Sequence, residues 1–222
     1  MLDQKLIDLV TDSFWKILIP GLTVTVPLTA LAFSLAMAIA VAVALVQFAN
    51  LRVLKQLCRF YIWVVRGTPL LVQLFVVFFG LTKVGIVIDP FPAAVLVFSV
   101  NEGAYCAETI RGALESIPAG QLEAGRCLGL SWFQTVRSVI LPQALRAAFP
   151  ALSNSLIAMM KDTSLAANIT VTEMFMATQR INARVYEPLV LYIEVGVIYL
   201  MFSTVLTWLQ RWGEKKLGTY IV

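Results

Sequence analysis

The 222-residue chain contains no histidine, and this absence excludes much catalytic chemistry. Histidine is the commonest general base and metal ligand near neutral pH, so we expect neither an enzyme nor a metal site. The three cysteines, Cys58, Cys106 and Cys127, are odd in number and irregularly spaced, which argues against a disulfide framework or a zinc site. The sequence also lacks a GxxxxGK[ST] phosphate-binding loop, so any ATP that drives this protein must bind to another chain.

Charged residues are scarce at 14% of the chain, whereas 59% of the residues are hydrophobic and the mean hydropathy is +0.84. A soluble domain of this length needs more charge to cover its surface, so the composition predicts an integral membrane protein. Basic cytoplasmic loops then explain the net charge of +4, and we expect no nucleic-acid partner. The first apolar run is too long for the core of a signal peptide, and we interpret it as a retained span.

Runs of about 20 apolar residues, the length that a helical span needs, predict an all-α fold with about five transmembrane helices. The predicted spans cover about 18–47, 54–81, 91–113, 133–160 and 188–209, in a single transmembrane domain over residues 1–222. With the amino terminus outside and the carboxyl terminus in the cytoplasm, eleven of the 17 lysines and arginines lie on the inner side. This orientation is expected, because the cytoplasmic loops of membrane proteins carry an excess of positive charge. The segment between the third and fourth spans is then cytoplasmic.

That cytoplasmic segment contains closely spaced signals for helix ends. Ser116 is a candidate N-cap, and Gly129 is placed to end a short helix in a left-handed conformation. Ser131 and Gln134 have the spacing of a capping box that begins the next helix. The pattern predicts a cytoplasmic helix over about 118–128, which is either a docking element or part of an ordinary loop between spans.

The same segment resembles the EAA motif of the permease subunits of ATP-binding-cassette (ABC) importers. That motif is Glu-Ala-Ala, three residues, Gly, nine residues, Ile, one residue and Leu-Pro. It is matched by Glu123, Ala124, Gly129, Leu141 and Pro142, with Gly125 and Val139 as conservative replacements. Further blocks resemble the polar amino acid branch of the family, which handles histidine, glutamine, arginine and cystine: RGTPLLVQLF from Arg66, AYCAETIRGALESIPAGQ from Ala104, LPQALR from Leu141 and KDTSL from Lys161.

The resemblance implies a type I ABC importer permease in the bacterial cytoplasmic (inner) membrane, which moves a polar or charged amino acid by alternating access. The short helix would dock into a cytoplasmic ATP-binding subunit through Glu123, Ala124, Gly125, Gly129 and Leu130. ATP and magnesium would bind to that subunit, and this chain would hold no cofactor. The other implied partners are an extracytoplasmic amino-acid-binding protein, membrane lipid, and a second permease copy or a related permease, since five spans are few for a whole pathway.

Ionisable residues inside the third predicted span are candidates for a functional site, because a charge in a span costs about 2.5–3.5 kcal/mol on insertion scales. Asn101, Tyr105 and Glu108 share one helix face, and we predict that Asn101, Glu102 and Tyr105 line a substrate pathway. Glu108 and Arg111 are three residues apart, so they fit an intrahelical ion pair with a structural role near the inner surface.

A second candidate stretch, Lys161, Asp162, Thr163 and Ser164, ends the fourth predicted span. It offers charges of both signs and hydroxyl groups, which complement the carboxylate and ammonium groups of an amino acid. The alternative is a plain helix terminus, where a cation is favourable, but the resemblance favours the substrate pathway.

Glu194 is a lone carboxylate in the middle of the fifth span. If Glu194 and Glu102 both face a central cavity, their negative charges favour a cationic substrate.

Gly67, Thr68 and Pro69 interrupt the second predicted span. Proline removes a backbone hydrogen bond and glycine lets the chain bend, so a kink is expected, either as a hinge or as a packing feature. Arg66 and Gln73 flank the interruption and favour a polar lining.

The alternative function is an ATP-independent channel or ion- or proton-coupled carrier, in which Glu102, Glu108, Lys161 and Glu194 would form the relay. A carrier needs no element that docks an ATPase, so the short capped helix is the feature that discriminates between the two functions.

Overall fold

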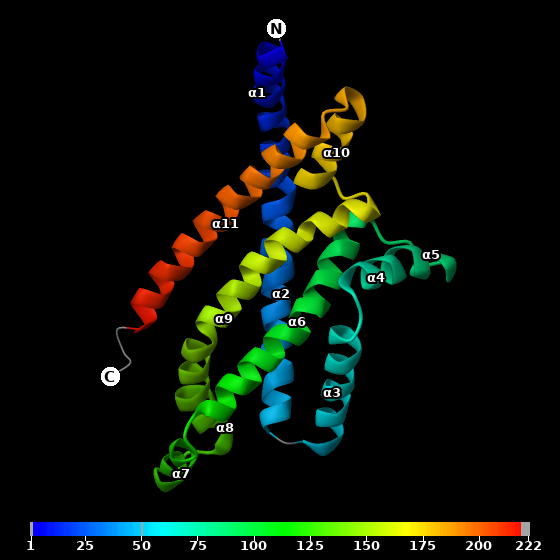
Figure 1. The fold of residues 1–222 in the computed structure, drawn as a ribbon. Coiled ribbons are helices and arrows are strands. Elements are labelled where there is room, and N and C mark those ends of the chain that lie inside the picture. Colours follow the sequence, from blue (N-terminus) through cyan, green and yellow to red (C-terminus); the bar gives the residue numbers. More distant parts are fainter. Residues whose placement is uncertain (1, 50, 219–222) are drawn as a thin grey trace. The chain divides into compact units, whose positions relative to one another are not determined.

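The computed structural model describes residues 2–49 and 51–218, and helices are the only regular elements in these ranges (Figure 1). This confirms the predicted all-α fold. The α-helices are α1 (Leu2–Pro20), α2 (Val26–Phe48), α3 (Arg52–Arg66), α4 (Leu70–Phe75), α5 (Leu81–Lys83), α6 (Pro90–Ser116), α7 (Gly120–Cys127), α8 (Trp132–Thr135), α9 (Leu141–Asp162), α10 (Met174–Val185) and α11 (Pro188–Gly218). Three π-helical turns, η1 (Gly21–Thr25), η2 (Val76–Gly80) and η3 (Val136–Ile140), and the 3-10 helix η4 (Thr163–Ile169) join some of them.

The first helix is much longer than the predicted span, because α1, η1 and α2 follow one another without a break. The run from Gln4 to Phe48 has 45 residues, which corresponds to about 68 Å of helix, whereas the hydrocarbon core of a bilayer is about 30 Å thick. The helix continues through the charged amino-terminal segment, where Asp12 and Lys16 form an ion pair at the favourable spacing of four residues. The predicted start at residue 18 therefore marks a change in hydropathy within a longer helix.

Two helices of the described chain are long and apolar enough to cross a membrane, the run Gln4–Phe48 and α11. A third span results if the broken pair Arg52–Arg66 and Leu70–Lys83 is taken as one. The helices α6 and α9, which the sequence predicts as spans, have the length but carry more polar residues. The count of five spans stays a prediction.

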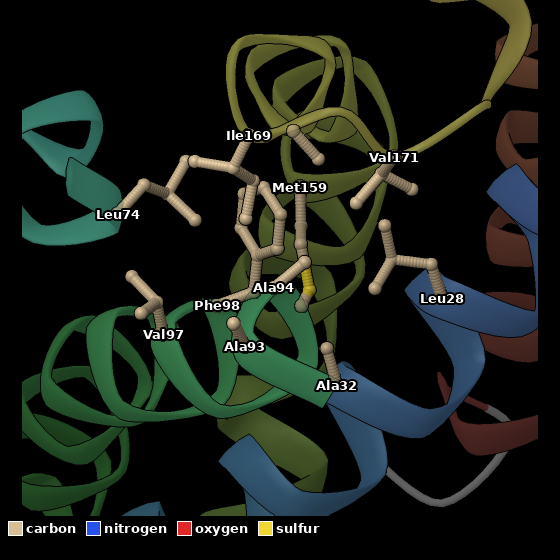
Figure 2. Close-up of a cluster of buried hydrophobic side chains, with 11 residues drawn as sticks. Leu28, Ala32, Leu74, Ala93, Ala94, Val97, Phe98, Met159, Ile169 and Val171 are labelled. Carbon is tan, nitrogen blue, oxygen red and sulfur yellow. The ribbon is translucent and has the colours of Figure 1, made fainter. Parts of the chain in front are cut away.

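The described residues group into two compact units. Within the described ranges, the first unit comprises residues 2–33, 69–98 and 156–209, and the second comprises residues 34–49, 51–68, 99–155 and 210–218. In the core of the first unit, side chains from α2, α4, α6 and α9 and from the segment 166–171 point toward one another (Figure 2). Alanines at positions 32, 93, 94 and 166 let these backbones approach closely, and close packing is what holds helices together in lipid.

A smaller apolar cluster of the first unit joins α1, α10 and α11 through Ile17, Met174, Val195 and Ile198. Next to it, a Cβ atom added at Gly21 would lie 2.7 Å from the Met174 sulfur, so a larger residue here would require the Met174 side chain to shift.

In the second unit, α2 buries alanines at every fourth position, Ala36, Ala40 and Ala44. Such a stripe of small residues is typical of close helix contacts in membranes. The hydroxyl of Tyr61 on α3 donates a hydrogen bond to the Val100 carbonyl of α6, at 2.6 Å. This hydrogen bond links α3 to α6, the two helices that carry most of the polar groups described below.

Candidate functional site

The predicted docking helix is present as α7, but it begins differently from the prediction. Ser116 is the last residue of α6, and its hydroxyl donates to the Ala113 carbonyl instead of capping the following helix. The prediction of a Ser116 cap is wrong because α6 continues to this residue, which satisfies the hydroxyl within its own last turn. The helix starts at Gly120, after Ala119, which provides no side-chain cap.

The carboxyl end of α7 has the predicted geometry. Gly129 has φ +75°, and its N–H donates to the Arg126 carbonyl at 2.9 Å, while the Leu130 N–H donates to the Gly125 carbonyl at 3.0 Å. These two bonds form a Schellman motif, in which a left-handed residue closes the helix. The capping box of α8 is also confirmed, since Ser131 and Gln134 exchange the two expected hydrogen bonds. The chain between α7 and α8 is therefore fixed by hydrogen bonds at both ends.

Replacing Gly129 by alanine is expected to destabilise α7 by about 1–2 kcal/mol, because L-residues other than glycine are disfavoured at positive φ. The matched control is Gly112→Ala on α6, since a Cβ atom meets nothing within 4 Å at either position and only Gly129 has a positive φ. Hydrogen exchange of the α7 amides in the detergent-solubilised protein measures the difference. Equal exchange in the two variants would contradict the role of the left-handed turn.

One face of α7 packs on α8 and the other is open. Gly125 is buried against Thr135, and a Cβ atom at this position would lie 2.5 Å from the Thr135 methyl and closer still to its hydroxyl. Glu123, Ala124 and Leu128 are exposed, and Leu128 keeps 79% of its surface accessible. An exposed leucine beside an exposed carboxylate, on a helix that is fixed to the rest of its unit, is suited to bind a partner protein.

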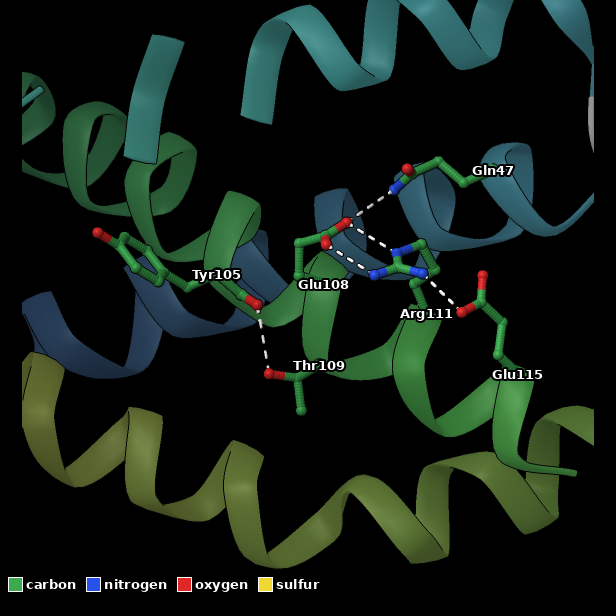
Figure 3. A network of polar contacts seen from close by, with 6 residues as sticks. All are labelled: Gln47, Tyr105, Glu108, Thr109, Arg111 and Glu115. Carbon is green, nitrogen blue, oxygen red and sulfur yellow. Dashed lines mark hydrogen bonds and ion pairs between the residues drawn. The ribbon is translucent and has the colours of Figure 1, made fainter. Parts of the chain in front are cut away.

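A polar network joins the last turns of α6 to the end of α2 (Figure 3). Two guanidinium nitrogens of Arg111 donate to the two oxygens of Glu108, at 3.0 and 2.9 Å, which confirms the predicted ion pair. Arg111 also donates to Glu115 at 2.6 Å, and the Gln47 amide donates to Glu108 at 3.3 Å. Beside this network, α3 and the ends of α2 and α6 enclose a pocket of about 360 Å³.

The structure brings together two residues that the sequence assigns to different sites. The guanidinium carbon of Arg66, at the end of α3, lies 5.0 Å from the ring centroid of Tyr105 on α6, a cation–π contact. Tyr105 is 40% exposed, whereas Asn101, one turn earlier, is buried. Glu102 accepts a weak hydrogen bond from the Cys106 thiol of the same helix.

The chain is interrupted between α3 and α4, at the residues where the sequence predicts a kink. Gly67 is the C-cap that follows α3, and a Cβ atom here would lie 2.7 Å from the Trp63 carbonyl oxygen. The Thr68 hydroxyl donates to the Val64 carbonyl, and Pro69 is extended and precedes the first residue of α4. Gln73 lies within α4.

The segment 161–164 has the features of a helix terminus. The Thr163 hydroxyl is buried and donates to the Met160 carbonyl, and the Ser164 hydroxyl donates to the Lys161 carbonyl. Both hydroxyls thus satisfy carbonyl groups at the end of α9. Lys161 and Asp162 are exposed, which leaves their charges accessible for a ligand.

Glu194 lies in a contact between α11 and α1 rather than in an open position. It keeps only 7% of its surface accessible, and one of its carboxylate oxygens accepts a hydrogen bond from the Ser13 hydroxyl. The sequence could not reveal this pair, because the two residues are 181 positions apart.

Sequence reasoning also missed Glu173, a buried residue between α9 and α11. Its carboxylate accepts the N–H groups of Phe175 and Met176 at the start of α10 and the hydroxyl of Tyr199. Burial raises the pKa of Glu173, and the three hydrogen bonds oppose this rise. Glutamate is not among the usual N-cap residues, so no N-cap signal marks this position in the sequence.

A family model described as the binding-protein-dependent transport system inner membrane component matches residues 35–219. The L-cystine transport system permease protein TcyB of Bacillus subtilis (strain 168) is 44% identical over 215 residues, which cover 96% of this chain and 92% of TcyB. The glutamine transport system permease protein GlnP of Escherichia coli (strain K12) is 43% identical over 159 residues, which cover 71% of this chain and 73% of GlnP.

Solved structures support the same assignment. A crystal structure of an amino acid ABC transporter with histidines has a TM-score of 0.85 and 32% identity, and the match covers 93% of this chain and 96% of that one. The methionine ABC transporter MetNI in an inward-facing conformation has a TM-score of 0.77 at 20% identity, over 90% of this chain and 96% of that one, which supports the fold alone. The chain therefore belongs to the family of inner membrane components of binding-protein-dependent transport systems.

Proposed function

We propose that this permease moves a polar amino acid into the cell as part of an ABC importer, with its amino terminus outside and its carboxyl terminus in the cytoplasm. The observation that carries the proposal is α7, a short helix that exposes Glu123, Ala124 and Leu128 and is fixed by the Schellman motif and the capping box. Family membership favours this function over a proton-coupled carrier, which needs no docking helix. Relatives named for L-cystine and glutamine transport support a polar amino acid as substrate.

The energy source belongs to other chains in this proposal. ATP and magnesium bind to cytoplasmic ATP-binding subunits, one for each permease, and each subunit holds one α7 helix. A second permease, identical or related, completes the pathway, and an extracytoplasmic binding protein delivers the amino acid. This permease holds no cofactor and has no catalytic residue of its own.

Within the pathway, Tyr105 and Arg66 are the best-placed pair for a substrate carboxylate, since their contact leaves the ring partly exposed beside a permanent positive charge. Lys161 and Asp162 offer a second pair of charges. Glu194 is less suited to bind substrate, because it is buried in the contact between α1 and α11.

A natural cysteine allows a direct test of docking. Cys127 is exposed and is the last residue of α7, whereas Cys106 is buried. In membranes that contain the complete transporter, a thiol-to-amine cross-linker is expected to join Cys127 to the ATP-binding subunit. The product is identified by mass and by peptide sequencing.

The control variants are Cys127→Ser, which must abolish the cross-link, and Cys58→Ser, which must retain it. An ATP-binding subunit that copurifies but never cross-links through Cys127 would contradict docking by α7. The substrate is tested separately, by ATP hydrolysis of the reconstituted transporter with binding proteins loaded with cystine, glutamine or arginine. No stimulation by any amino acid would overturn the transport proposal.

A further inference from the structure

The pocket beside the α6 network is lined mainly by polar and charged groups and lies where three helices end or begin. Lys55 and Arg59 come from the first half of α3, and Glu108, Arg111 and Glu115 come from the last turns of α6. Its volume of about 360 Å³ leaves room for a small charged group. The docking function of α7 does not use this pocket.

The α3 helix carries a stripe of positive charge. It contains four basic residues, Arg52, Lys55, Arg59 and Arg66, and no acidic residue. At 100° per residue these four fall on one face, and Lys55 and Arg59 are neighbours at a spacing of four. The pocket therefore receives two adjacent cations from α3.

The carboxylates on the opposite wall are engaged by α6 itself. Both oxygens of Glu108 accept hydrogen bonds from Arg111, and Glu115 accepts one from the same guanidinium group. Arg111 cancels one of the two negative charges on that wall, and with Lys55 and Arg59 on α3 the lining as a whole carries one net positive charge. An anion is the complementary ligand.

One exposed aromatic residue lines the pocket, and a second one lies next to it. Trp63 lines the pocket and keeps 71% of its surface accessible, and its ring centroid lies 5.9 Å from that of Phe60, which is 62% exposed. Exposed aromatic rings beside basic residues at a helix end are typical of the headgroup level of a membrane. A free phosphate would use the cations but not these rings, so the surface fits a lipid better than a soluble anion.

We propose that this pocket binds the headgroup of an anionic phospholipid, with Lys55 and Arg59 on the phosphate and an acyl chain along Trp63 and Phe60. Basic pockets between helices are a known way for membrane proteins to hold such headgroups. The site lies in the same unit as α7, at the carboxyl end of α6 from which the docking helix continues. A bound lipid would thus hold α3 against the helix that leads into α7.

Native mass spectrometry of the complete transporter, delipidated in detergent, tests the proposal. Dioleoyl phosphatidylglycerol is added in parallel with dioleoyl phosphatidylethanolamine and dioleoyl phosphatidylcholine, and the bound copies are counted at each concentration. We expect phosphatidylglycerol to bind tightest. The double variant Lys55→Gln/Arg59→Gln is expected to weaken its binding by about 10- to 30-fold, since each basic side chain near a headgroup adds substantially to the attraction.

The matched control is Arg180→Gln/Arg184→Gln, because these two arginines are also four residues apart and exposed, but lie on α10. This control must bind phosphatidylglycerol like the unaltered protein. Trp63→Ala is the second variant, and it is expected to lose affinity several-fold without a change in net charge. Equal binding of the three lipids, or unchanged binding by both pocket variants, would overturn the proposal.

The source of the anion is decided by competition with sn-glycerol 1-phosphate, which has a phosphate but no acyl chain. We expect displacement of phosphatidylglycerol only at concentrations at least about 1,000-fold above that of the lipid, because acyl-chain burial contributes much of the affinity. Displacement at equal concentrations, with no effect of Trp63→Ala, would assign the site to a soluble phosphate and overturn the lipid proposal. None of these readouts depends on the transported amino acid, so failure here is distinguishable from failure of the transport function.

Discussion

Replacing Glu123 by lysine is expected to reduce amino acid uptake at least about 30-fold while the protein stays folded in the membrane. Glu123 is exposed in the first turn of α7, so its substitution leaves no buried group without a partner. Loss or reversal of one charge in a docked pair typically costs about 2–5 kcal/mol of binding free energy, and 2 kcal/mol corresponds to about 30-fold. Uptake and ATP hydrolysis of the reconstituted transporter, at equal protein levels, measure the effect.

Two further variants separate the possible causes of such a loss. Glu123→Gln removes the charge without reversing it and keeps the side-chain size, so an intermediate loss is expected. Glu187→Lys reverses an exposed acidic residue outside α7 and controls for the change in net charge. Uptake by Glu123→Lys that equals uptake by Glu187→Lys would mean that the α7 carboxylate does not face the ATP-binding subunit.

Features that depend on neighbouring residues in the chain could be predicted from the sequence. The left-handed Gly129, the capping box of Ser131 with Gln134, and the pair of Glu108 with Arg111 all involve residues at most four positions apart. For such features the chemistry of the turn determines the structure. The exception is Ser116, where two local solutions compete, because a serine at this position satisfies either the helix that ends there or the helix that follows.

Features that depend on packing between distant segments could not be predicted. The contact of Glu194 with Ser13 could not be predicted, because the two residues lie near opposite ends of the chain. The anion pocket also escaped detection, because its cations and its carboxylates come from helices about 50 residues apart in sequence, such as Arg59 and Glu108. Hydropathy alone likewise could not place the beginning of the first helix, since ion pairing lets a helix continue into a charged segment.

Replacing Gly125 by alanine is expected to be strongly damaging, although it adds only one methyl group. The new Cβ atom would lie 2.5 Å from the Thr135 methyl, 3.0 Å from the Thr135 Cβ and closest of all to the hydroxyl. Rotation of Thr135 offers little relief, because its hydroxyl donates to the Ser131 carbonyl at 3.0 Å and its Cβ cannot move without the backbone. The alanine is therefore expected to push α7 away from α8, at a cost of about 1–3 kcal/mol.

At position 125 the chain departs from the motif that it resembles. The EAA motif has alanine where this chain has Gly125, so Gly125→Ala restores the motif and would be harmless if the motif residue alone mattered. In this structure the space of that methyl group is taken by Thr135. We therefore expect the restored motif to lower uptake, with ATP hydrolysis no longer coupled to transport.

A double-mutant cycle with Thr135→Ala identifies the cause. The threonine variant removes the hydroxyl and the methyl that collide with the new Cβ, and by itself it is expected to cost about 1 kcal/mol through the lost hydrogen bond. The double variant Gly125→Ala/Thr135→Ala is expected to be more stable than Gly125→Ala alone and to recover coupled transport. Two contacting residues give interaction energies of about 0.5–3 kcal/mol in such a cycle, whereas independent effects simply add. Additive losses would show that the close contact of α7 with α8 does not set the position of the docking helix.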